Sequence, residues 1–116
     1  MSDTKQNPKK TDVSPNNLTD SKTFDERISN LVPAYLQNRH NELSELKNLI
    51  IKLEYKQIER IGHRLKGNAL SYGFPKLSEY GAQLETAAKA LDQELIHTII
   101  EKIESFLSTQ STKMTS

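Results

Sequence analysis

Cysteine is absent from this sequence. The fold therefore cannot depend on disulfide bonds, and thiolate metal sites are excluded. No apolar run approaches the length of a membrane span or of a signal-peptide core, so we expect a cytoplasmic protein. An excess of one charge is also missing, because 16 basic and 15 acidic residues leave a formal net charge of +1. The sequence therefore lacks the excess of positive charge that is typical of proteins that bind nucleic acid or a membrane surface.

The length and the composition allow one small domain with polar ends. Only 34% of the 116 residues are hydrophobic, so part of the chain is expected not to fold. Residues 1–22 contain only Val13 and Leu18 to bury, and burial cannot offset the entropy of ordering such a segment. We expect a disordered tail over 1–22, a folded domain over 23–108 and a frayed tail over 109–116. Whether the first tail is inert or tethers a partner stays open.

Capping and helix-breaking residues predict one short helix and four long ones. The short helix covers 24–31 and begins with a capping box formed by Thr23 and Glu26. Connections of two to four residues make successive long helices neighbours, and no alternating pattern predicts a strand. We therefore expect an all-α fold, an antiparallel up-down-up-down four-helix bundle with a short extra N-terminal helix. The residues that start or end the long helices are Pro33, Gly73, Pro75 and Asp92.

Apolar residues at spacings of three and four give each long helix one inward stripe. No second stripe is left over for a dimer, so we expect a monomer. The predicted inward residues are Leu36, Leu43, Leu46, Leu49, Ile50 and Leu53 in the first helix, Ile58, Ile61, Leu65, Ala69 and Tyr72 in the second, Leu77, Tyr80, Leu84, Ala88 and Leu91 in the third, and Leu95, Ile96, Ile99, Ile103, Phe106 and Leu107 in the fourth.

The second long helix, from about Lys56 to Tyr72, carries a histidine on its outer face. At about 100° per residue, His63 lies almost opposite the apolar stripe, so its ring should point to water. Lys66 and Gly67 follow three and four residues later and lie beside the ring. A mid-helix glycine costs about 1 kcal/mol relative to alanine, which close approach of another molecule would explain. A nucleophilic imidazole beside an ammonium group suggests reversible phosphorylation of His63.

The surface around His63 is expected to dock a partner. Two further residues have structural roles: Asn68 should form a hydrogen bond at a helix interface near His63, and Gly73 should end the helix. The predicted partner-binding residues beside Gly67 are Leu70, Phe74, Lys56, Glu59 and Arg60.

The sequence resembles histidine-containing phosphotransfer (HPt) domains, the helical phosphoryl carriers of two-component phosphorelays. The resemblance covers roughly residues 24–108. It is carried by HRLKGNA at 63–69, YGF at 72–74 and an amphipathic run over 77–84.

By this resemblance, His63 is the phosphoacceptor, Lys66 supports the phosphoryl group and Gly67 admits the partner. Two positions depart from the family's pattern. Asn68 stands where serine or another small residue is frequent, and Leu53-Glu54 replaces a glycine and an aspartate ahead of the histidine helix.

The resemblance implies that His63 exchanges a phosphoryl group with the aspartate of response-regulator receiver domains, and that a sensor or hybrid histidine kinase is a further partner. The sequence has no Gly-rich phosphate loop, no carboxylate cluster for Mg²⁺ and no nucleotide motif. We therefore expect a carrier that is not an enzyme and has no cofactor of its own, with Mg²⁺ held in the partner receiver domain.

Two other functions compete with this interpretation. One is a helical adaptor that binds a receiver or another signalling partner without phosphotransfer. The second is a metal-binding or catalytic bundle that uses His40, His63 and His97. These histidines lie on three different helices and lack the spacing that such sites use, which argues against the second alternative.

Overall fold

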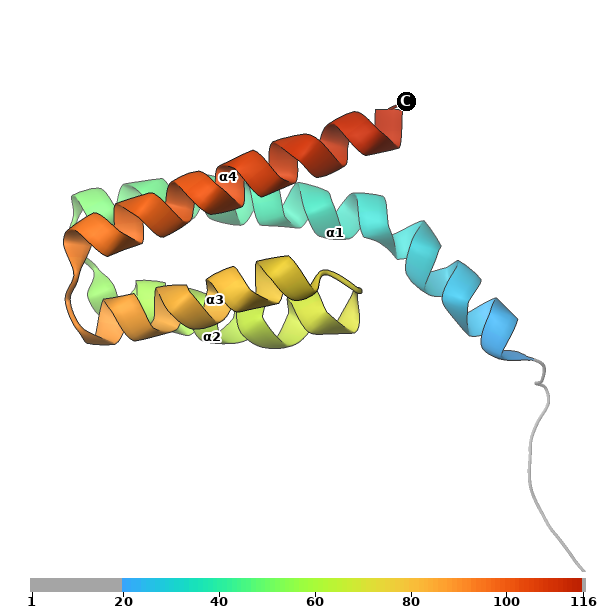
Figure 1. Ribbon diagram of the computed structural model, residues 1–116, viewed down its shortest axis with the longest axis horizontal. Coiled ribbons are helices and arrows are strands. Elements are labelled where there is room, and N and C mark those ends of the chain that lie inside the picture. The colour runs from blue at the N-terminus through green and yellow to red at the C-terminus, as the bar shows by residue number, and fades with distance from the viewer. Residues whose placement is uncertain (1–19, 116) are drawn as a thin grey trace, which may run out of the picture. The chain divides into compact units, whose positions relative to one another are not determined.

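The computed structural model describes residues 20–115, with side chains described over 30–110. The regular structure of this part of the chain is entirely helical and contains no strand, so the predicted all-α class is confirmed (Figure 1). The chain divides into two compact units, Met1–Pro33 and Ala34–Ser116. All contacts described below lie within the second unit. The helices are α1 (Asp20–Ile51), α2 (Tyr55–Ser71), α3 (Pro75–Lys89) and α4 (Gln93–Thr115).

The first helix differs from the prediction at its N-terminal end. Helix α1 runs without interruption from Asp20 through Pro33, so the short helix over 24–31 is not a separate element. A proline inside a helix removes one backbone hydrogen bond, while the bonds on either side can still propagate. The division into two units falls at this same proline. Most of the predicted disordered tail, residues 1–19, lies outside the described residues.

The C-terminal end also differs, because α4 continues to Thr115 where a frayed tail was predicted from residue 109. Polar residues do not by themselves stop a helix once it has been nucleated, since each further residue adds one backbone hydrogen bond. At Thr109 the hydroxyl donates a hydrogen bond to the carbonyl of Ser105 at 3.1 Å, within the same helix.

The core of Ala34–Ser116 is aliphatic and follows the predicted stripes in most positions. Each fully buried aliphatic side chain contributes roughly 1.5–3 kcal/mol through removal from water. Tyr35 is buried too, although the sequence did not predict it. The predicted inward residues that are buried are Leu36, Leu43, Leu46, Leu49, Ile50, Ile58, Ile61, Leu65, Ala69, Leu77, Leu84, Ala88, Ile96, Ile99, Ile103 and Leu107.

Three leucines predicted to face inward are exposed instead, namely Leu53, Leu91 and Leu95. Leu53 and Leu91 follow the ends of α1 and α3 with positive φ angles of 58° and 57°, so the helical period no longer sets their direction. Leu95 lies in the first turn of α4. Its backbone N–H donates to the side chain of Asp92 at 3.1 Å, which confirms Asp92 as the N-cap.

All three connections between helices end the preceding helix in the same way. After α1, the N–H of Leu53 donates to Ile50 and that of Glu54 to Leu49. The same pattern of bonds to the third and fifth preceding residues recurs after α2, at Gly73, and after α3, at Leu91. Gly73 adopts its φ of 85° freely, whereas a left-handed leucine costs about 1–2 kcal/mol. Leu53 thus takes the backbone conformation that a glycine would favour.

Two glycines bring the backbones of α2 and α3 into direct contact, and the two helices lie side by side in Figure 1. A Cβ atom added to Gly62 would lie 2.6 Å from the backbone nitrogen of Glu85. A Cβ added to Gly81 would lie 2.6 Å from the backbone nitrogen of Lys66. Nearby, the hydroxyl of Ser78 donates to the carbonyl of Lys66 at 2.6 Å. This close approach fixes which α3 residues lie beside the outer face of α2.

Candidate functional site

The ring of His63 projects from the middle of α2 into solvent. Its side chain is 67% exposed, as the helical projection predicts. Ile61 and Leu65 on the same helix are almost completely buried. The amphipathic pattern of α2 therefore packs the helix against the core on one face while the imidazole on the other face remains accessible to another molecule.

A carboxylate on α3 holds one nitrogen of this ring. Nδ1 of His63 lies 3.1 Å from Oε2 of Glu85, and the Glu85 side chain is only 14% exposed. An ionised carboxylate can only accept a hydrogen bond, so the neutral ring carries its proton on Nδ1 and donates it to Glu85. The lone pair of Nε2 is then available at the exposed side. An exposed imidazole nitrogen with a free lone pair is chemically able to act as a nucleophile.

Glu85 also contacts two lysines. Its Oε1 lies 3.2 Å from Nζ of Lys66, and its Oε2 lies 3.8 Å from Nζ of Lys89. Partial burial acts to raise the pKa of Glu85, but the hydrogen bonds from Lys66 and His63 and the positive charge of Lys66 outweigh it and lower the pKa. The carboxylate therefore stays ionised at neutral pH and can accept the hydrogen bond from Nδ1 of His63.

Sequence reasoning missed both Glu85 and Lys89. Glu85 lies one helical turn after Gly81, on the α3 face that meets α2. The glycine at position 62 beside the histidine was the available signal. Two facing glycines allow close helix approach, and a polar residue one turn away then reaches the neighbouring helix.

Gly67 leaves open space beside the site. A Cβ atom added there would meet nothing within 4 Å, in contrast to Gly62 and Gly81. Packing within the described residues therefore gives no reason for a glycine at this position of a helix. Leu70, which is 62% exposed, lies three residues further along α2. An incoming surface would meet no side chain at Gly67 and an apolar one at Leu70.

The other predicted docking residues differ in their surroundings. Lys56 and Glu59 form an ion pair with each other at 3.6 Å, and Arg60 is exposed. Phe74 is half-buried, and its ring stacks on Tyr35 with centroids 6.0 Å apart and meets Phe106 edge-on at the same distance. Phe74 thus belongs to an aromatic cluster, which accounts for its residue type without a partner.

Asn68 lies at the interface of α1 and α2. Its side-chain oxygen accepts a hydrogen bond from the hydroxyl of Tyr35. The Tyr35 ring in turn stacks on Tyr72 with centroids 4.2 Å apart. Burial raises the pKa of Tyr35, so its hydroxyl remains a donor. This contact links α1 to the α2 backbone five residues after His63. Gly73, with its positive φ, lies in the turn that ends α2, as predicted.

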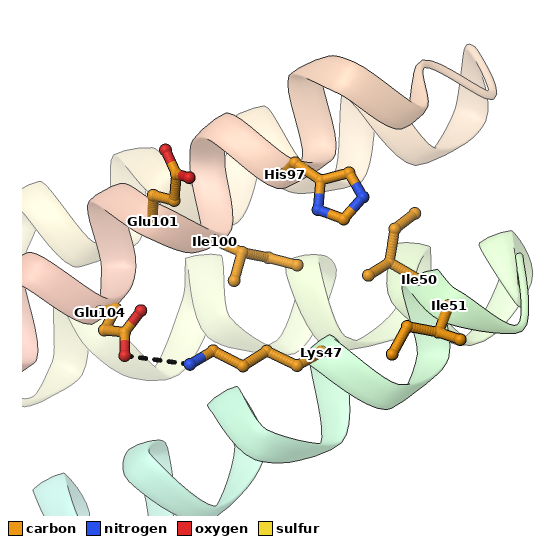
Figure 2. Close-up of a pocket in the computed structure, with 7 residues that line it drawn as sticks. All are labelled: Lys47, Ile50, Ile51, His97, Ile100, Glu101 and Glu104. Carbon is orange, nitrogen blue, oxygen red and sulfur yellow. Dashed lines mark hydrogen bonds and ion pairs between the residues drawn. The ribbon is translucent and has the colours of Figure 1, made fainter.

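His97 belongs to a different surface, between α1 and α4. His97 is exposed on α4 and lies at one end of a hollow of about 300 Å³ between α1 and α4. Figure 2 shows the ring near Ile50, with the ion pair of Lys47 and Glu104 at the opposite end, where the charged atoms are 3.0 Å apart. Over the described residues, no three His, Cys, Asp or Glu side chains are grouped to hold a metal ion.

Comparison with known proteins identifies the chain's family. A search of curated proteins and a search of solved structures each gave no match. Within residues 20–115, no helix combines the length and the apolarity needed to cross a bilayer. The family model described as "Hpt domain" matches residues 30–109, which include all of α2 and α3 and the site around His63. The chain therefore belongs to the Hpt domain family.

Proposed function

We propose that this protein carries phosphoryl groups on His63 and exchanges them with the aspartate of response-regulator receiver domains in a two-component phosphorelay. Hpt domains perform histidine phosphotransfer in two-component signalling. The observation that carries the proposal is the exposed His63 ring, held through Nδ1 by Glu85 beside the open space at Gly67.

The transfer step follows from the orientation of the ring. The Nε2 lone pair attacks the phosphorus of an aspartyl phosphate, and the N–P bond forms as the P–O bond to the aspartate breaks. The electron pair of that bond remains on the leaving carboxylate. The ring keeps its Nδ1 proton and becomes an imidazolium, whose positive charge is stabilised by Glu85 at 3.1 Å. In the reverse step His63 is the leaving group.

Lys66 would contribute charge to the same step. Its ammonium group lies 3.2 Å from Glu85, three residues from the ring, and it can turn toward the phosphoryl oxygens when these arrive. Phosphoryl transfer depends on positioning and on neutralising charge around an in-line transition state. The partner receiver would supply the aspartate and the Mg²⁺, so the chain acts as a carrier that is not itself an enzyme.

The partner would dock over the outer face of α2. Support comes from the bare surface at Gly67 and the exposed Leu70, which together offer an apolar contact next to the reactive nitrogen. Lys56, Glu59 and Arg60 would form a charged rim N-terminal to the ring. The same surface would serve receivers and a sensor or hybrid histidine kinase in turn, since both must reach His63.

The bundle itself is proposed to be antiparallel, with up-down-up-down topology, and to be a monomer in the cytoplasm. Cross-helix contacts support opposite directions for α2 and α3, because Gly62 meets Glu85 whereas Lys66 meets Ser78. The connections between successive helices are three residues long, and such short connections support antiparallel neighbours throughout the bundle.

Incubation with a phosphorylated receiver domain tests the proposal. We expect an acid-labile, base-stable label on the wild type and none on His63→Gln. The variant should unfold at nearly the wild-type midpoint because the side chain is exposed. A wild type that binds the receiver but takes no label would be an adaptor, and the carrier function would be wrong.

A further inference from the structure

A shallow hollow lies one turn before His63 on the outer face of α2. Its volume is about 390 Å³. Helical side chains lean toward the N-terminus of their helix, so the His63 ring extends over the preceding turn and forms one wall of this hollow. We call it the His63 hollow. The residues that line it are Glu59, Arg60, His63, Arg64 and Glu85.

The charged residues of the His63 hollow differ in whether they are already paired. Glu59 pairs with Lys56 at 3.6 Å, and Arg64 reaches Glu42 on α1 at 3.6 Å. Glu85 is engaged by His63 and by lysines. Arg60 makes no ion pair with any residue from 30 to 110, the range whose side chains are described. An unpaired guanidinium therefore stands in the same hollow as the nucleophilic ring.

Phosphorylation of His63 would add negative charge that Arg60 could bind. A phosphoryl group on Nε2 carries about two negative charges near neutral pH. Lys66 and Lys89 bring two positive charges, but they share the negative charge of Glu85. The imidazolium that forms is held by the same carboxylate, so all three of these cations already contact Glu85. Arg60 is the cation of the hollow that forms no ion pair within residues 30–110, and its planar fork suits two phosphoryl oxygens at once.

We propose that Arg60 binds the phosphoryl group on His63, from the turn before the ring, as Lys66 does from the turn after. The inference rests on the proposed phosphotransfer function and changes the expected role of Arg60 from contacting a partner protein to contacting the transferred group. Arg60 then stabilises the charge that builds on the equatorial oxygens while the N–P bond forms, and it does so without any receiver present.

Phosphoramidate, a small donor that requires no docking, isolates this role in the full chain. We expect Arg60→Gln to be labelled on His63 about tenfold more slowly than the wild type, and Arg60→Lys to recover most of the rate. The ³¹P resonance of the labelled Arg60→Gln protein should titrate at higher pH than that of the wild type, because a nearby cation favours the dianion. If Arg60 had only a structural role, Arg60→Gln would not shift the titration of the phosphoryl group, and Arg60→Lys would not recover the rate.

Arg64→Gln is the matched control, since Arg64 lines the same hollow but is paired with Glu42. Its labelling rate should stay within about twofold of the wild type. Equal rates and coincident ³¹P titrations for Arg60→Gln and the wild type would overturn the inference while leaving the proposed function intact. A wild type that takes no label from phosphoramidate or from a phosphorylated receiver would overturn the proposed function, and this inference with it.

Discussion

Gly81→Ala should destabilise the protein and disturb the site, although alanine is the better helix former. An added Cβ would lie 2.6 Å from the nitrogen of Lys66, 2.9 Å from the oxygen of Gly62 and 3.0 Å from the carbonyl carbon of Leu65. All three atoms belong to the α2 backbone, which cannot rotate away as a side chain can. Bringing the shortest contact from 2.6 Å to an ordinary 3.4 Å requires α2 and α3 to separate by about 0.8 Å.

The magnitude follows from two opposing effects. Overpacking costs roughly 1–3 kcal/mol, near the upper end where backbone meets backbone, and the gain in helix propensity returns about 1 kcal/mol. We therefore expect the free energy of unfolding to fall by about 2 kcal/mol, which corresponds to a melting temperature lower by about 10 °C for a domain of this size. Glu85 would move with α3 and lose its contact to Nδ1 of His63, so phosphoryl acceptance should slow as well.

Gly67→Ala is the matched control, because a Cβ there meets nothing within 4 Å. It should stabilise the protein by about 1 kcal/mol and leave labelling by phosphoramidate unchanged. Urea unfolding followed by circular dichroism measures both variants. A Gly81→Ala midpoint equal to or above that of the wild type would show that the two helices are not held together by this glycine contact.

Three further substitutions test separate parts of the account. Glu85→Gln should accept phosphate from a receiver about tenfold more slowly, because the neutral amide stabilises the imidazolium less. Since the folded-state pKa of Glu85 is lowered, its contribution to stability is present above its usual pKa of 4.5 and is lost as the pH falls through the lowered value. Wild-type and Glu85→Gln unfolding free energies should therefore converge in acid, and a constant difference would contradict this. Gly67→Arg should weaken receiver binding by obstruction while leaving labelling by phosphoramidate intact, and transfer at the wild-type rate would show that the open surface is not used. Asp92→Ala should cost about 1 kcal/mol through loss of the N-cap of α4, and an unchanged urea midpoint would refute that.

The helical period alone predicted much of what positions the site. It placed His63 outward and the aliphatic stripes inward, because burial of one helix face dominates wherever the helix is regular. It failed at Leu53 and Leu91, where the backbone turns left-handed and the period ends. The predicted start of a new helix at Pro33 was also wrong, because the loss of one hydrogen bond does not end a helix that continues on both sides.

The carboxylate that orients the ring could not be predicted in the same way. Glu85 reaches His63 only because Gly62 and Gly81 let two backbones touch, and which faces of two helices meet is a tertiary property. Periodicity within one helix contains no information about that contact. Tyr35 is a second example, since its role depends on the hydroxyl reaching Asn68 across the α1–α2 interface.

The most direct test of the central claim is to identify the phosphorylated atom. The protein would be labelled by a phosphorylated receiver and its histidine ring nitrogens assigned by ¹⁵N and ³¹P NMR. We predict a single phosphoryl group on Nε2 of His63, with the proton retained on Nδ1 toward Glu85. Attachment at Nδ1, or on any other residue, would contradict it.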